Sequence, residues 1–204
     1  YWSRYTILID KDYGGKVVSP DDVNTKLMIA PNVLPDDAYI ILKIASADSS
    51  INEANRKAEL NQFIEVIKNY IPYREITAFN RVLTSISELK GKAELRIPYP
   101  DADNDGIVDN TSISASKLKM FVLDEKRNEW ELITDSFADV DNKVVIGKVP
   151  HFSIFTIMGY YASFDLEESI ISWPNPYIAG KHRYMINIGF NLNRDAKLTI
   201  KIYT

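Results

Sequence analysis

Apolar and polar residues alternate along much of the chain, and this period of two constrains the fold more than any other feature of the sequence. Successive side chains of a strand point to opposite faces of a sheet, so the alternation is typical of strands with one buried face. The clearest runs are residues 92–99, 117–122, 129–132, 184–192 and 196–202. Turn-forming residues lie between strand-like segments, at 13–15, 19–22, 141–143 and 193–195. Many short strands joined by turns predict a mainly all-β fold, an antiparallel β-sandwich.

One segment interrupts the strand pattern. Residues 52–70 carry apolar side chains at helical spacing, and good helix formers fill the first half of the segment. Residues 63–67 and 73–77 could equally form two strands. We therefore expect a short helical insertion near residues 52–60, followed by strand.

A domain boundary is expected near residues 160–172. The predicted strand 152–158 ends at a glycine, an acidic stretch follows, and residues 173–176 contain two prolines. Proline cannot join a central strand, but it starts a new unit well. The sequence thus predicts one β-sandwich domain over residues 1–160, then a linker and a partial second β module over residues 161–204.

Composition excludes several classes of protein. The 204 residues carry 24 Lys and Arg against 28 Asp and Glu, with two His and no Cys. A net charge of −4 opposes a basic nucleic-acid-binding surface. Zinc fingers, iron–sulfur clusters and thiol catalysis are excluded or nearly so. We also expect no membrane span, because no apolar run approaches the roughly 18 residues that a spanning helix needs.

The two ends of the sequence suggest a piece of a longer protein. The chain opens at Tyr1 without a methionine and stops at Thr204 within an alternating pattern. Further domains of the same protein are therefore expected beyond both ends.

An ordered set of motifs resembles the ZU domain family, which is named after zona occludens proteins and netrin receptors. The set begins with a double glycine and a strand running into a proline, and it closes on a His-Phe-Ser motif. Its members here are Gly14-Gly15, residues 27–35, Ile97-Pro98-Tyr99, the acidic loop from Asp101 to Asp109, Glu129-Trp130 and residues 149–153. The likeness covers roughly residues 13–159 and is greatest to bacterial and archaeal extracellular relatives. It implies an extracellular β-sandwich.

The end of the chain is similar to a different family. Trp173-Pro174-Asn175-Pro176-Tyr177 precedes an alternating strand that reaches Leu192, and residues 195–203 continue the pattern. This order resembles the start of immunoglobulin-like C-terminal modules, such as those of the flagellar hook-capping protein and of type IX secretion sorting domains. It implies a partial immunoglobulin-like β module.

The acidic loop carries the strongest chemical signal. Asp101, Asp103, Asp105 and Asp109 alternate with other residues, and Gly106 permits a sharp turn. Oxygen ligands at such spacing wrap a hard cation, so the sequence predicts a Ca²⁺ site with these carboxylates and the Ile107 carbonyl as ligands. The twelfth position is Ser112, where an EF-hand has a bidentate Glu, so the loop is not an EF-hand. The alternative is a solvated acidic turn.

His151, Phe152 and Ser153 resemble the self-cleavage motif of related animal ZU domains and of nucleoporins. The resemblance implies Ser153 as nucleophile, His151 as base, and cleavage between Phe152 and Ser153. In a regular strand, residues two apart share a face but lie about 6.5–7 Å apart, beyond hydrogen-bond reach. Cleavage therefore needs a kinked peptide. The alternative is that Phe152 fills the core while His151 and Ser153 face a neighbouring strand or water.

These observations favour a non-catalytic, extracytoplasmic structural or interaction module, stabilised by Ca²⁺, within a larger secreted, surface or assembly protein. Its expected partners are other protein subunits or surface components. Two alternatives stay open. An autoproteolytic domain would cleave itself between Phe152 and Ser153. A carbohydrate-binding accessory module would need an exposed row of aromatic side chains, for which Trp2, Trp130 and Trp173 are candidates.

Overall fold

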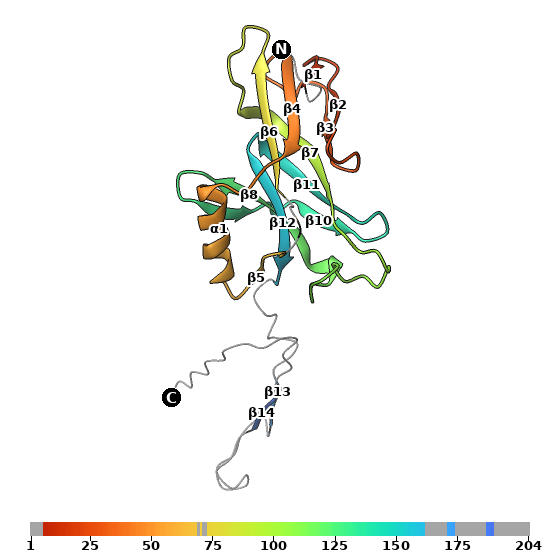
Figure 1. Ribbon diagram of the computed structural model, residues 1–204, viewed down its shortest axis with the longest axis vertical. Coiled ribbons are helices and arrows are strands. Elements are labelled where there is room, and N and C mark those ends of the chain that lie inside the picture. Colours follow the sequence, from red (N-terminus) through yellow and green to blue (C-terminus); the bar gives the residue numbers. More distant parts are fainter. Residues whose placement is uncertain (1–5, 69, 71–72, 162–170, 174–186, 190–204) are drawn as a thin grey trace. The chain divides into compact units, whose positions relative to one another are not determined.

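The computed structural model describes residues 6–68, 70, 73–161, 171–173 and 187–189 (Figure 1). The chain divides into two compact units, Tyr1–Tyr160 and Tyr161–Thr204. No helix among the described residues is long and apolar enough to cross a membrane.

In the described part of the first unit, two antiparallel sheets pack face to face as a sandwich (Figure 1). The seven-stranded sheet has the order β1 (Thr6–Ile9), β4 (Ala38–Ile44), β6 (Arg74–Asn80), β12 (Ile154–Tyr160), β8 (Leu118–Asp124) and β9 (Glu129–Leu132), with β5 (Ile64–Glu65) also paired to β12. The five-stranded sheet has the order β10 (Ser136–Asp139), β11 (Val144–His151), β7 (Glu88–Pro98), β3 (Lys26–Ile29) and β2 (Gly15–Val18). The predicted antiparallel β-sandwich is thus confirmed.

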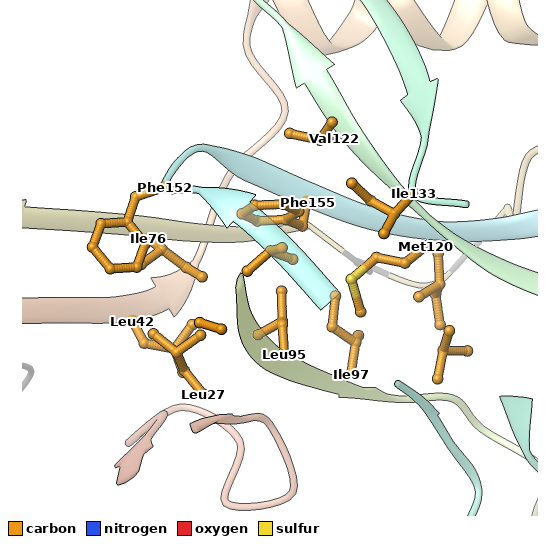
Figure 2. Packing of buried hydrophobic residues seen from close by; sticks show 14 of the residues in the cluster. Leu27, Leu42, Ile76, Leu95, Ile97, Met120, Val122, Ile133, Phe152 and Phe155 are labelled. Atoms are coloured by element: carbon orange, nitrogen blue, oxygen red, sulfur yellow. The ribbon is translucent and has the colours of Figure 1, made fainter. Parts of the chain in front are cut away.

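The main core lies between the two sheets, where the predicted alternation decides which side chains face inward. Figure 2 shows Phe155 of β12 and Met120 of β8 lying across from Leu95 and Ile97 of β7. All four side chains are at most 1% exposed. Each large apolar side chain buried in this way contributes about 1.5–3 kcal/mol to stability through the hydrophobic effect. Packing of β7 against β8 and β12 therefore fixes the two strands that flank the acidic loop.

A second core lies on the other face of the seven-stranded sheet, under helix α1 (Ser49–Glu59). Asp48 caps the helix by accepting a hydrogen bond from the Ile51 amide at 2.9 Å. Trp130 stacks on Tyr73 with ring centroids 6.0 Å apart and donates from its indole nitrogen to Asn55 on the helix, at 2.9 Å. Because this layer covers the sheet, strand β12 is buried on both faces, and Phe155–Gly159 form one continuous buried run.

The helix and strand predicted for residues 52–70 are confirmed, with adjusted ends. Helix α1 starts three residues earlier than predicted, at Ser49, because Asp48 supplies the cap. It stops at Glu59, and Leu60 beyond it is 76% exposed. The predicted strand beyond the helix is reduced to β5, because only Ile64 and Glu65 reach the end of β12.

The double glycine at the start of β2 allows a close approach of two chain segments. Gly14 has φ +66°, and a Cβ atom there would lie 2.2 Å from the Ile29 carbonyl oxygen. At Gly15, a Cβ atom would lie 2.8 Å from the side chain of Ile9. Any larger residue in place of Gly14 would therefore both strain the backbone and push β2 away from β3.

In the second unit, the described residues form one two-stranded antiparallel ladder. Strand β13 (Ile171–Trp173) pairs with β14 (Asn187–Gly189), and Ile171 lies opposite Gly189. Strand β14 falls inside the predicted strand 184–192. The predicted strand 196–202 and the turn at 193–195 lie outside the described residues, as does Trp2.

Candidate metal centre

The acidic loop connects the two sheets of the sandwich. It leaves β7 of the five-stranded sheet at Pro98 and reaches β8 of the other sheet through a short 3-10 helix, η1 (Ala115–Lys117). Backbone hydrogen bonds close the loop on itself, from Asp109 to the Pro100 carbonyl at 3.0 Å and from Ala115 to the Gly106 carbonyl at 2.8 Å. The loop is therefore a structured crossover between sheets.

Left-handed backbone conformations bend the loop so that its acidic side chains meet. Asn104 has φ +62° and Gly106 has φ +77°. A Cβ atom at Gly106 would meet no described heavy atom within 4 Å, so the backbone conformation, and not lack of space, favours glycine there. Asparagine is also among the residues that tolerate this conformation best. Asn104 and Gly106 thus allow the backbone to bend at these two positions of the loop.

Three of the four predicted carboxylates gather at one point. Asp101, Asp103 and Asp109 each offer one oxygen, and these oxygens all lie within 4.8 Å of one another. Two oxygens bound to the same Ca²⁺ at about 2.3–2.6 Å lie at most about twice that distance apart, so the spacing fits a shared cation. Without a cation, three carboxylates this close repel one another. The group can therefore supply three oxygen ligands to one hard cation.

Asp101 is the unusual member of this group. Its side chain is 3% exposed, and its Oδ1 atom has no hydrogen-bond partner among the described residues. Buried polar atoms are nearly always paired, so an exception calls for a ligand. The nearest positive charge is the Lys143 ammonium, which lies 4.0 Å from Oδ1 and donates a hydrogen bond to the main-chain carbonyl of Asp101. The carboxylate is thus left with capacity to bind a cation.

Burial of Asp101 follows from the strand before it. Ala93, Leu95, Ile97 and Tyr99 are the inward-facing residues of the alternating run, and all are at most 4% exposed. Asp101 comes two residues after Tyr99 and continues the same period, so it too lies inward. The alternation that predicted the core therefore also carries the signal for a buried carboxylate, a signal that the motif alone does not contain.

Tyr99 is a member of the site that the sequence reasoning missed. Its hydroxyl is buried and has no hydrogen-bond partner within the described part of the chain. Burial raises the pKa of Tyr99, and the negative charges of Asp101, Asp139 and Asp141 raise it further. The turn between β10 and β11 therefore brings additional carboxylates close to the acidic loop. No local spacing in the sequence predicts that Tyr99 and the carboxylates of this turn lie beside the acidic loop.

The other two predicted ligands, Asp105 and Ile107, form contacts within the loop. Asp105 lies outside the group of three described carboxylates, and its Oδ1 atom accepts a hydrogen bond from the Ile107 amide at 2.8 Å. Ile107 forms an isolated bridge with Ser114. At the twelfth position, the Ser112 hydroxyl donates to Glu65 Oε1 at 3.3 Å and so connects the loop to β5. The gathered ligand set is thus smaller than the predicted one.

The His-Phe-Ser motif spans the end of β11 and the connection to β12, because His151 is the last residue of β11 while Phe152 and Ser153 lie between the two strands. Strand β12 begins at Ile154, two residues later than predicted, and a register shift occurs between Val149 and His151. The His151 Nδ1 atom lies 3.4 Å from the Phe152 carbonyl oxygen. The Ser153 hydroxyl donates to the Leu123 carbonyl of β8 at 3.3 Å. Phe152 is 6% exposed and belongs to the main core.

No family model matches the chain, and no curated protein matches it. The likenesses to ZU and immunoglobulin-like domains therefore stay predictions that rest on motifs.

Proposed function

We propose that this chain is a non-catalytic structural module whose acidic loop binds Ca²⁺ through Asp101, Asp103 and Asp109. The single observation that carries the proposal is the Asp101 carboxylate, 3% exposed and with Oδ1 lacking a hydrogen-bond partner among the described residues, at the meeting point of three acidic side chains. A buried charge without compensation is costly, and a bound cation removes that cost.

The chemistry of the group favours Ca²⁺ over other cations. All three side chains offer carboxylate oxygen, which suits hard cations and not zinc or copper. Ca²⁺ accepts about six to eight oxygen ligands in flexible geometry, whereas Mg²⁺ demands a near-ideal octahedron. Backbone carbonyls or water would complete the shell. With few charged ligands, the dissociation constant should be about 10⁻⁴–10⁻³ M, as in extracellular modules.

The position of the loop defines what the cation would do. Because the loop crosses from β7 in one sheet to β8 in the other, a bound ion would hold the end of the sandwich closed. Affinity in the millimolar range is useful only where calcium is abundant. We therefore propose an extracytoplasmic location and protein or surface partners, in keeping with the resemblance to extracellular ZU-like and immunoglobulin-like domains.

Thermal unfolding with calcium or with a chelator tests the proposal. Saturation at some tens of times the dissociation constant should stabilise the folded state by about 2 kcal/mol and raise the melting temperature by a few degrees. Asp103→Asn should abolish that response. The matched control is Asp105→Asn, which removes the same charge from the loop but keeps the oxygen that accepts from Ile107. Identical melting curves in calcium and chelator for the unaltered protein would refute the proposal.

The autoproteolytic alternative has less support, because the Ser153 hydroxyl donates to the Leu123 carbonyl. The proton that a nucleophilic Ser153 must give up is directed at a main-chain carbonyl and not at His151, whose Nδ1 atom lies 3.4 Å from the Phe152 carbonyl oxygen. We expect the purified chain to stay intact, with its full mass of 23.3 kDa under denaturing conditions. A smaller fragment beginning at Ser153, lost in Ser153→Ala, would establish self-cleavage instead.

The carbohydrate-binding alternative is also weakened. Trp130 is 8% exposed, stacked on Tyr73 and hydrogen-bonded to Asn55, so it offers no flat aromatic surface to a sugar. Its role is packing between helix α1 and the seven-stranded sheet.

A further inference from the structure

Lys143 occupies a constrained position beside the acidic loop. It ends the turn between β10 and β11, where the Asn142 amide and side chain both donate to the Asp139 carboxylate, at 3.1 and 2.8 Å. Lys143 has φ +52°, a left-handed conformation that lysine rarely adopts. Its carbonyl accepts a hydrogen bond from the Tyr99 amide at 3.1 Å. The backbone of this residue is therefore fixed against the start of the acidic loop.

The side chain of Lys143 reaches the buried end of the carboxylate group. Its ammonium donates to the Asp101 main-chain carbonyl and lies 4.0 Å from Asp101 Oδ1. The lysine side chain is 32% exposed, whereas the aspartate side chain is 3% exposed. At 4.0 Å the ammonium is near enough to offset the charge but too distant for a hydrogen bond to Oδ1. Its exposure also leaves it able to move toward water.

We propose that Lys143 is an internal counter-ion of the candidate metal centre, which stabilises the cation-free loop and lowers its affinity for cations. The inference rests on the proposed function, because it concerns the regulation of the same site. The ammonium partly neutralises Asp101 when no metal is bound. When a metal ion binds, the two positive charges repel each other, and Lys143 must turn toward solvent.

This arrangement selects among ions by charge. Coulomb repulsion between Lys143 and the bound ion grows in proportion to the charge of the ion. Removal of the ammonium should therefore improve the binding of a trivalent ion more than that of a divalent one. A purely structural role for Lys143 predicts no such dependence on charge.

Cation binding by a set of Lys143 variants tests the proposal. Ca²⁺ affinity is measured by calorimetry, and Tb³⁺ affinity by the luminescence that nearby tyrosine excites, for which Tyr99 is well placed.

Lys143→Met removes the charge and keeps the length of the side chain. Lys143→Asn also removes it, and asparagine tolerates the left-handed conformation, so this variant guards against misfolding. Lys143→Arg keeps the charge. The matched control is Lys148→Met, which removes a lysine of β11 that pairs with Glu94 of β7 at 2.7 Å.

Both neutral variants should bind Ca²⁺ about 5- to 20-fold more tightly than the unaltered protein does. The gain in affinity on a logarithmic scale should be about one and a half times as large for Tb³⁺ as for Ca²⁺, in proportion to the charges of the two ions. Lys143→Arg and Lys148→Met should stay within about twofold of the unaltered protein. The neutral variants should also melt at a lower temperature in chelator.

The possible failures are distinguishable. If the unaltered protein binds Ca²⁺ but both neutral variants bind it equally or more weakly, this inference is overturned and the proposed function stands. If binding appears only in the neutral variants, the counter-ion role is supported, and the proposed function of the native chain is not. Absence of binding in every protein would overturn both.

Discussion

Asp22 and Asp101 are acidic residues near the ends of strands, and they differ in their hydrogen-bond partners. Asp22 lies in the turn before β3 and has a 20% exposed side chain. Its Oδ2 atom accepts from the Thr25 hydroxyl at 2.8 Å and from the Arg74 guanidinium at 2.9 Å. Asp101 is more deeply buried, at 3% exposure, yet its Oδ1 atom has no hydrogen-bond partner among the residues the structure describes.

The difference separates a structural carboxylate from one that is free to bind a ligand. Arg74 is 1% exposed and would be a costly buried charge without Asp22, so the pair is internally complete. Burial by itself raises the pKa of Asp22, but the hydrogen bonds from Thr25 and Arg74 outweigh that effect and leave the pKa below its usual value. Depth of burial therefore does not identify the site; the count of partners does.

The two Asp→Asn substitutions should change stability in opposite directions, and this is the largest effect that we expect. In chelator, Asp22→Asn leaves the Arg74 charge buried without a counter-charge and should lower the free energy of unfolding by about 3 kcal/mol. In chelator, Asp101→Asn removes a buried charge and should raise the free energy of unfolding by about 1 kcal/mol. Urea denaturation measures both values.

Calcium provides the control for this pair. Asp101→Asn should lose its advantage when calcium is added, because it removes a ligand, whereas the effect of Asp22→Asn should be the same in calcium and chelator. Two substitutions that destabilise equally in chelator would show that both carboxylates are structural, and the comparison between them would fail.

The local parts of the fold were accessible from the sequence because they depend on spacing within short segments. Alternation at 92–99 predicted the buried face of β7, and the Asx-and-glycine pattern predicted the bend of the acidic loop. Helix α1 was expected near its observed place. The sequence predicts that β12 starts at Phe152, whereas it starts at Ile154, after a register shift at the end of β11.

Partners that are distant in sequence could not be predicted in this way. Arg74 and Asp22 are 52 residues apart, and Lys143 and Asp101 are 42 residues apart. Each contact depends on which strands become neighbours, and a single sequence with local periodicity does not specify that order. The three gathered carboxylates were therefore predicted, whereas their neighbours Lys143 and Tyr99 were found only in the structure.

The smallest expected effect concerns acid pH and separates the two carboxylates by a different property. Because the pKa of Asp22 is lower in the folded state, its ionised form contributes stability that is complete above the unfolded value of about 3.9 and is lost as pH falls through the folded pKa. In chelator, the difference in melting temperature between the unaltered protein and Asp22→Asn should be constant above about pH 5 and shrink below about pH 4.

The same pH series in saturating calcium should add a second acid-sensitive component, because protons compete with the cation for the ligating carboxylates. That component should persist in Asp22→Asn and be absent from Asp103→Asn. Melting temperatures measured at closely spaced pH values can resolve the two components, since only one of them responds to chelator. If the chelator-independent component vanished in Asp103→Asn and persisted in Asp22→Asn, the roles of the two regions would be reversed. Acid sensitivity would then belong to the loop, and the buried ion pair would contribute little that depends on charge.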